Sequence, residues 1–275
     1  MLHGHFTGGF SVKNCLTVAG SDCSGGAGVQ ADLGTFWALG CYGMSVITSV
    51  VAENTAQVLA AHSVPRDIVS AQLRAVFTDI HVDAVKLGML PDAECMGAVA
   101  ATLREYRPNI VVCDPVLHAS AGAALMEGGA LGTFMREIAP LCTLITPNIP
   151  EAQALSGLSV STRDDMRAAA LAIHKLGARA VLVKGGHLEG AALDVLYDGE
   201  RFYEYTHERV NTRATHGTGC TLSSAAAAFM AQGEPLAQAV RLAKEYLTGA
   251  IMHGLNIGMG QQPFDRFYRL FAERT

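Results

Sequence analysis

A glycine-rich hexapeptide, Thr215-His216-Gly217-Thr218-Gly219-Cys220, precedes the alanine-rich run 221–231. The run has the small, apolar composition of a buried helix, which predicts that the glycines lie at its N-terminal end, where backbone N–H groups lack partners within the helix. Such an end binds anions, because glycines let the backbone approach a phosphate and the helix dipole favours negative charge. Fixed N–H donors would also stabilise charge that develops on a transferred phosphoryl group. The sequence therefore predicts a phosphate site at Gly217, Thr218 and Gly219.

Cys220 falls in the first turn of this predicted helix, beside the expected phosphate. A helix N-terminus lowers the pKa of a thiol, whereas a nearby triphosphate raises it, so the sequence leaves the protonation state of Cys220 open. The same residues also permit a purely structural interpretation, in which Thr and Gly cap a helix that carries a small buried cysteine.

A second glycine-rich segment, 20–28, follows the short apolar strand predicted at 15–19. Helical spacing then runs from 29 to 39 and ends at a glycine. The order strand, glycine turn, helix is typical of a ligand-binding loop, although the glycines match the dinucleotide fingerprint only loosely. The alternative is a turn that serves only tight packing of the strand against the helix.

Polar or glycine residues follow strand after strand along the chain. Further strands are predicted at 42–51, 82–87, 109–113, 142–146 and 180–183, a hairpin at 194–205, and helices at 65–80, 91–106, 127–138, 162–176, 218–232 and 235–253. The groups that follow the strands are Ser21 to Gly28, Glu53, Gly88-Met89, Asp114, Asn148 with Glu151, and Lys184. In open α/β sheets, ligands bind at the carboxyl ends of the strands. We therefore expect a three-layer α/β fold, with a mostly parallel sheet, helices on both faces and one crevice that gathers these groups.

The composition agrees with a globular protein that acts on small molecules. The 275 residues are 50% hydrophobic and 16% charged, enough to bury a large core, and we expect a single domain at 13–275 behind a frayed arm at 1–12. A net charge of -5 without a basic cluster argues against a nucleic-acid surface. The seven scattered cysteines show no metal-ligand spacing, and no apolar stretch reaches the roughly 18 residues of a membrane span. These features indicate a cytoplasmic protein without membrane partners.

Several motifs together resemble a known family of kinases. They are Ala19-Gly20-Ser21-Asp22, Gly25 to Asp32, Lys86 to Met89, Asp114-Pro115-Val116, Thr146 to Glu151, Lys184 to His187 and His216 to Cys220. In these motifs the chain is similar to the hydroxymethylpyrimidine and phosphomethylpyrimidine kinases of thiamine biosynthesis, over about residues 16–252. The resemblance implies the ribokinase-like fold, with ATP and Mg2+ as cofactors. It also implies two successive phosphorylations of 4-amino-5-hydroxymethyl-2-methylpyrimidine, to the monophosphate and then to the diphosphate.

The resemblance also implies roles for individual residues. On the ATP side they are Lys184 as a clamp on the phosphates, with Asp114, Asn148 and Thr215, and the catalytic group is Cys220 with Gly217, Thr218 and Gly219. Glu151 and Asp114 would supply oxygen ligands to Mg2+, directly or through its waters. Asn148 and Glu151 also fit a capping box for the helix after Pro150, so their metal role stays open. On the substrate side, Asp32, Glu53, Gly20, Met89 and Val116 would surround the pyrimidine.

Glu53 departs from the pattern of many relatives, which have Gln at this position. A Gln amide both donates and accepts hydrogen bonds, so it can pair with a ring nitrogen and an exocyclic amine together, whereas a carboxylate only accepts. To keep both contacts, either Glu53 or the ring must carry a proton. Substrate binding is therefore expected to tighten as the pH falls.

Two other functions remain open from the sequence. A pyridoxal kinase of the type that carries a cysteine at the position of Cys220 would bind a ring with the same hydroxymethyl group. A non-catalytic vitamin-sensing module is the other alternative, although such a module has little need of Lys184, Asp114 and Cys220 together. His187 and His216 stay outside the catalytic set, because a structural histidine is the commoner case. A homodimer is expected, since dimers are common among such folds.

Overall fold

A computed structural model describes residues 12–117, 125–186, 192–207, 210 and 212–270. The predicted N-terminal arm lies outside the described residues except for its last residue, and so does His187. Among the described helices, none combines the length and apolarity that crossing a bilayer requires.

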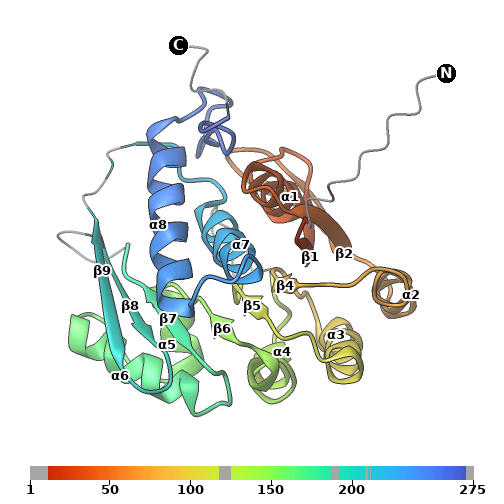
Figure 1. Cartoon of the computed structure of the whole chain (residues 1–275). Coiled ribbons are helices and arrows are strands. Elements are labelled where there is room, and N and C mark those ends of the chain that lie inside the picture. The colour runs from red at the N-terminus through yellow and green to blue at the C-terminus, as the bar shows by residue number, and fades with distance from the viewer. Residues whose placement is uncertain (1–11, 118–124, 187–191, 208–209, 211, 271–275) are drawn as a thin grey trace, which may run out of the picture.

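Nine strands of the described chain form a sheet in the order β3-β2-β1-β4-β5-β6-β7-β8-β9 (Figure 1). The strands are β1 (Asn14–Asp22), β2 (Tyr42–Glu53), β3 (Val58–Ser63), β4 (Ala84–Leu87), β5 (Val111–Cys113), β6 (Leu144–Ile145), β7 (Val181–Lys184), β8 (Ala192–Tyr197) and β9 (Phe202–His207). The neighbouring strands β2, β1, β4, β5, β6 and β7 are parallel. At the two edges, β3 pairs antiparallel with β2, β8 with β7, and β9 with β8. The predicted mostly parallel sheet is confirmed.

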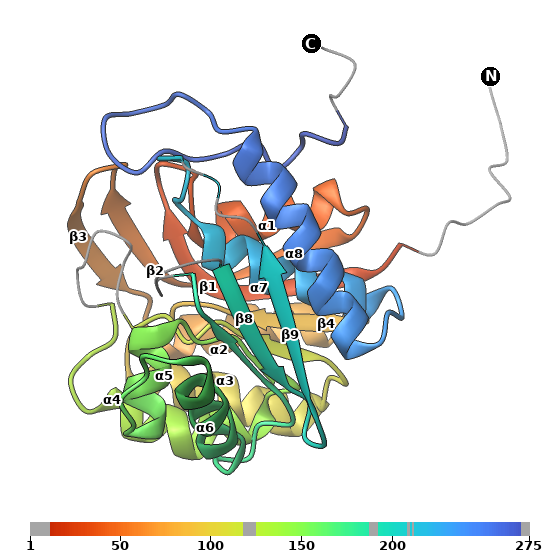
Figure 2. The ribbon, with the colours of Figure 1, turned by 90° about the vertical axis from the view of Figure 1, so that its left-hand side faces the viewer.

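Helices cover both faces of the sheet, as the two perpendicular views show (Figures 1 and 2). One face carries α2 (Arg66–Phe77), α3 (Ala93–Tyr106), α4 (Ala130–Thr133), α5 (Ile149–Ser156) and α6 (Arg163–His174). The other carries α1 (Gly28–Ala38), α7 (Thr218–Ala231) and α8 (Leu236–Met252). This is the three-layer arrangement expected from the sequence.

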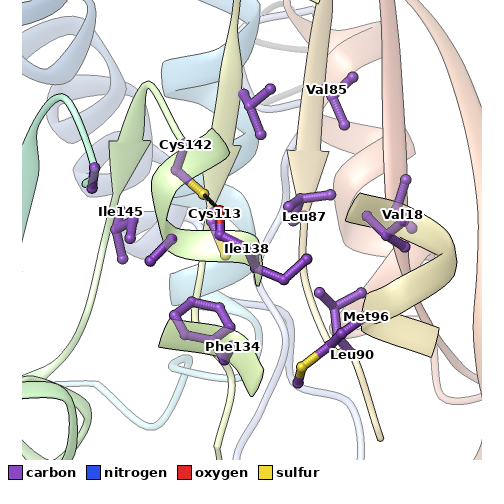
Figure 3. Close-up of a cluster of buried hydrophobic side chains, with 14 of the residues drawn as sticks. Val18, Val85, Leu87, Leu90, Met96, Cys113, Phe134, Ile138, Cys142 and Ile145 are labelled. Carbon is purple, nitrogen blue, oxygen red and sulfur yellow. Dashed lines mark hydrogen bonds between the residues drawn. The ribbon is translucent and has the colours of Figure 1, made fainter. Parts of the chain in front are cut away.

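Each face of the sheet has its own apolar core. On the first face, Phe134 and Ile138 pack with residues of α3 and of the central strands such as Met96 and Leu87 (Figure 3). On the second, Phe36 and Tyr246 are fully buried under α1 and α8. Because the central strands are covered on both faces, they consist of nearly continuous apolar runs rather than of alternating residues.

Three elements differ from the sequence prediction. Strand β3 was missed, because most of its residues are exposed and show no alternation of polar and apolar residues. Strand β1 continues past the predicted end through Asp22, with a change of register after Ala19. The helix predicted at 127–138 is a short α4 followed by a π-helical turn over Phe134–Ile138.

Helix α7 owes its position to its small residues. Ala225, Ala226, Ala227 and Ala228 are at most 1% exposed, and the helix packs on β1, β4 and β5 between α1 and α8. Short side chains let the helix lie close to the sheet. Its N-terminal end therefore meets the carboxyl ends of the central strands, where the site lies.

Candidate active site

A cleft of about 1030 Å³ opens at the carboxyl ends of the strands. It is lined by groups from β1, β2 and β7, from the segments after β4, β5 and β6, and from the N-terminal turn of α7 and one side of α8. Of the predicted site residues, those on its walls are Gly20, Glu53, Met89, Asp114, Val116, Asn148, Glu151, Lys184, Thr215, Gly217, Thr218, Gly219 and Cys220. The structure thus brings these residues together from seven separate segments of the chain.

The N-terminal end of α7 is open toward the cleft. Gly217 is the N-cap, with a φ of 83°, and no described side chain caps this end. A Cβ atom on Gly217 would lie 2.0 Å from the carbonyl oxygen of Gly26, so only glycine fits here without displacement of the glycine-rich segment 20–28. The buried guanidinium of Arg266 holds the two segments together, since it donates to the Gly26 carbonyl and to the Thr221 hydroxyl. The first turn of α7, whose N–H groups have no partners within the helix, borders the cleft, and the Thr218 N–H makes only a long contact of 3.4 Å with the Thr215 carbonyl.

Lys184 and Asp114 form an ion pair beside this helix end. The Lys184 Nζ and Asp114 Oδ1 atoms are 2.7 Å apart, and a Cβ on Gly219 would lie 2.7 Å from the other carboxylate oxygen of Asp114. Burial alone would lower the pKa of Lys184, but the carboxylates of Asp114 and Glu151 raise it. The ammonium therefore stays charged within reach of any anion held by α7.

Asn148 and Glu151 form the capping box of α5. The Asn148 side chain accepts from the backbone N–H of Glu151 at 2.9 Å, and the Glu151 carboxylate accepts from the backbone N–H of Asn148 at 2.8 Å. Burial, and to a smaller extent the charge of Asp114, raises the pKa of Glu151 to about 7, despite the opposing effect of Lys184. The carboxylates of Asp114 and Glu151 both border the cleft and act on each other, and such a set of oxygen donors fits a divalent cation.

Cys220 borders the cleft in the first turn of α7 and is partly exposed. Burial raises the pKa of its thiol to about 11, and the charges of Asp32 and Asp114 add to this effect. The ammonium of Lys86 and a hydrogen bond from the backbone N–H of Gly28 act in the opposite direction. The balance of these effects favours the protonated form of the Cys220 thiol at neutral pH.

The structure does not support the expected contact between Asp32 and a substrate. Its side chain is fully buried and lies outside the described lining of the cleft. The carboxylate accepts from Lys86 Nζ at 2.8 Å, from Thr17 Oγ1 at 2.6 Å and from Ser224 Oγ at 2.8 Å. An aspartate in the first helix was expected to reach the cleft, but α1 turns this side chain toward the sheet instead.

The end of the cleft near β1 and β2 combines a flat apolar slot with an acid. Met89 and Gly20 lie against each other, so that a Cβ on Gly20 would meet the Met89 sulfur at 3.0 Å. Glu53 stands at the end of β2, and burial together with the charge of Asp22 raises the pKa of its carboxyl to about 7. Near neutral pH the protonated and ionised forms of this carboxyl are therefore both populated.

Sequence reasoning missed two side-chain pairs on the cleft walls. His216 Nε2 lies 2.9 Å from Asp22 Oδ2, and this contact and backbone N–H groups offset the effect of burial and lower the pKa of Asp22 to about 2. Across the cleft, Lys244 of α8 pairs with Asp194 of β8 at 2.5 Å. A lysine on the apolar face of the last helix was the only signal for this second pair.

Comparisons with known proteins place these features in context. The family model for phosphomethylpyrimidine kinase matches residues 22–265. The chain is 47% identical to the hydroxymethylpyrimidine/phosphomethylpyrimidine kinase of Rhizobium meliloti, over 94% of this chain and 98% of the relative. It is 51% identical to the thiamine biosynthesis bifunctional protein of Geobacter sulfurreducens over 92% of its own length, but spans only 52% of that protein.

Among solved structures, the ADP complex of Bacillus subtilis pyridoxal kinase matches with a TM-score of 0.87 at 39% identity, covering 94% of this chain and 100% of the other. The match confirms the ribokinase-like fold that the motifs predicted.

The geometry of the helix end gives a first prediction. Gly217→Ala forces a positive φ on alanine and a clash with Gly26, so it is expected to lower the free energy of unfolding by about 1–3 kcal/mol. Gly97→Ala is the matched control, because this glycine lies inside α3 with nothing within 4 Å of an added Cβ, and the change should stabilise by about 0.5–1 kcal/mol. Urea unfolding measures both, and equal effects of the two changes would contradict the described approach of Gly217 to Gly26.

Proposed function

The chain belongs to the phosphomethylpyrimidine kinase family, and we propose that it transfers phosphoryl groups from ATP to 4-amino-5-hydroxymethyl-2-methylpyrimidine and then to its monophosphate. One observation carries this proposal: Lys184, Asp114 and Cys220, which are far apart in the sequence, meet at the open N-terminal end of α7. Phosphoryl transfer needs positioning and charge neutralisation more than covalent chemistry, and this site supplies both.

ATP would place its terminal phosphates against the first turn of α7. The N–H groups of Gly217, Thr218 and Gly219 favour the charge that develops on the phosphoryl oxygens, and Lys184 neutralises it. The ion pair with Asp114 keeps the Lys184 ammonium beside Gly219 before the nucleotide arrives. Thr215 and Asn148 lie on the walls next to these groups.

Mg2+ would be held by the carboxylates of Asp114 and Glu151, which both border the cleft. When bound, the ion neutralises charge on the phosphates during transfer. Glu151 is directed by its capping contact with Asn148, so its two roles are compatible: the helix cap fixes the carboxylate that borders the cleft. The raised pKa of Glu151 supports this role, because a bound cation would stabilise the ionised carboxylate.

The pyrimidine would occupy the slot between Gly20, Met89 and Val116, with Glu53 at its polar edge. In its protonated form, Glu53 can donate one hydrogen bond and accept another, which matches a ring nitrogen and the neighbouring amine. In its ionised form it only accepts. Glu53 then takes the part of the glutamine in many relatives only when it carries a proton.

This role makes pyrimidine binding depend on pH. Because the pKa of Glu53 is raised to about 7, affinity for the hydroxymethylpyrimidine is expected to increase about tenfold from pH 8 to pH 6. In Glu53→Gln the amide needs no proton, and the change should be less than about twofold. Glu105→Gln removes an exposed carboxylate of α3 and serves as the control. Calorimetric titration measures the affinity at each pH. If the affinity of Glu53→Gln depends on pH as that of the unchanged protein does, the Glu53 carboxyl does not hydrogen-bond to the ring.

The two phosphorylations should differ in their need for Cys220. The hydroxymethyl oxygen of the first substrate carries a proton that must leave, whereas the monophosphate is largely ionised near neutral pH. Cys220→Ala is therefore expected to slow the first transfer by about 100-fold or more and the second by less than about tenfold. Single-turnover rates with each substrate measure the two effects. Equal losses in both steps would mean that the thiol positions the substrate and accepts no proton.

A pyridoxal kinase activity is the second candidate, because the fold matches a pyridoxal kinase closely. Mass spectrometry of the products formed from ATP and Mg2+ with hydroxymethyl-pyrimidine and hydroxymethyl-pyridine substrates separates the two. We expect a pyrimidine monophosphate followed by a diphosphate. Phosphorylation of the pyridine alone would overturn the proposal in favour of the second candidate, and no phosphorylation at all would favour the sensing module.

We also propose a homodimer in a reducing, cytoplasmic environment. The seven cysteines are free thiols, which supports such an environment. Among the described strands, β3 lies at one edge of the sheet with a neighbour on one side only, and Val50 and Leu59 on β2 and β3 are 53% and 65% exposed. An apolar sheet edge of this kind is suited to contact with a second copy.

Leu59→Lys places a charge on this edge and should convert the dimer into a monomer in sedimentation experiments. Ile68→Lys, at an exposed apolar position on α2, is the matched control and should leave the dimer intact. If Leu59→Lys leaves the dissociation constant of the dimer unchanged, the interface does not include this edge of the sheet.

A further inference from the structure

A charged pair without contact to solvent lies in the interior next to the cleft. Lys86 on β4 and Asp32 on α1 are both fully buried, and their charged groups are 2.8 Å apart. A pair of this kind loses the hydration of two ions, so apolar residues of similar volume would often stabilise a fold as well or better. Nothing in the packing of a central strand requires a lysine at this position, which points to a use for its charge.

Three elements bring this pair close to Cys220. Ser224, which donates to Asp32 at 2.8 Å, lies one helical turn beyond Cys220 on α7 and so on the same side of the helix. Gly28, which donates to the Cys220 sulfur, begins the helix that carries Asp32. The Lys86 ammonium reaches the strand end, where a Cβ on Gly88 would lie 2.8 Å from its nitrogen.

Four charged groups act on the Cys220 thiol from the elements around it. Lys86 on β4 and Arg266 on the C-terminal segment are cations, and Asp32 on α1 and Asp114 after β5 are anions. Lys86 is the strongest of the groups that favour the thiolate. Although burial disfavours its charge, Asp32, Cys220 and Asp114 raise the pKa of Lys86, so the ammonium stays charged.

We propose that Lys86 is a positioning residue of the catalytic centre, whose ammonium stabilises negative charge on the Cys220 sulfur while Asp32 holds the ammonium in place. The step concerned is ionisation of the thiol, in which the S–H proton passes to solvent and the sulfur keeps the electron pair. This inference rests on the kinase function proposed above, because only a reaction that takes a proton at Cys220 needs the thiolate. It also gives Asp32 a role in place of the substrate contact that the structure does not support.

Alkylation of Cys220 by iodoacetamide tests the proposal without nucleotide or pyrimidine, so its outcome does not depend on whether the protein is a pyrimidine kinase. All variants carry Cys23→Ser, because Cys23 is the exposed cysteine of the chain, and peptide mass spectrometry locates the modified thiol. Only the thiolate reacts, so the rate at a fixed pH follows the ionised fraction. Lys86→Met should lower the rate at pH 8.5 about tenfold or more, and Asp32→Asn should raise it about tenfold.

Lys86→Met leaves a buried carboxylate unpaired and could fail to fold. The comparison of Asp32→Asn with the double variant Asp32→Asn/Lys86→Met then isolates the ammonium, and the double variant should react about tenfold more slowly. Ser224→Ala removes a hydrogen bond to Asp32 without a change of charge and should alter the rate less than about threefold. If Lys86→Met accelerates alkylation as Asp32→Asn does, the ion pair only limits access of the reagent to the interior, and the proposal is overturned. Rates within twofold of each other in Asp32→Asn and the double variant would also overturn it.

Discussion

The structure depends on a helix end, that of α7, at which Gly217 is the N-cap and no described side chain caps the backbone. The first turn of α7 borders the cleft with backbone N–H groups that have no partners within the helix, and Gly217 with a positive φ keeps side chains away from them. A helix end of this kind is costly unless something binds it, and the charges around it are arranged to suit an anion. Lys184 supplies the fixed cation, and Asp114 keeps that cation beside Gly219. The alanine-rich body of α7 serves the same end, because only short side chains let the helix reach the strand ends between α1 and α8.

Around this anion site, the chain places titratable groups whose neighbours set their protonation state. Burial raises the pKa of Glu53, Glu151 and Cys220 alike, but the three differ in what opposes it: Lys184 acts on Glu151, His216 on Glu53 and Lys86 on Cys220. The protonation states of these two carboxyls and this thiol are therefore sensitive to any charge or hydrogen-bond partner that a ligand brings. A cation at Glu151 and a ring at Glu53 would each supply a partner for the carboxyl.

Much of this could be predicted from the sequence, because parallel strands buried on both faces read as apolar runs, and the residues after them must meet at one edge of the sheet. Asp114, Lys184 and Cys220 were found in this way. Other features depend on tertiary contacts that leave no local trace. The orientation of Asp32 follows from how α1 packs on the sheet. The pair Asp194–Lys244 joins residues that are 50 positions apart. Strand β3 is an exposed edge strand in which polar and apolar residues do not alternate. The protonation state of Cys220 needed the balance of Lys86 against two acids, which no spacing reveals.

The central claim is that the first turn of α7 and Lys184 bind the phosphate that is transferred. A crystal structure of the protein with a non-hydrolysable ATP analogue and Mg2+ tests this most directly. The account predicts the terminal phosphate within hydrogen-bond distance of the backbone N–H groups at Gly217 to Gly219 and of the Lys184 ammonium, with its phosphorus facing the Cys220 side of the cleft. A terminal phosphate held elsewhere, with these N–H groups bound only to water, would contradict it.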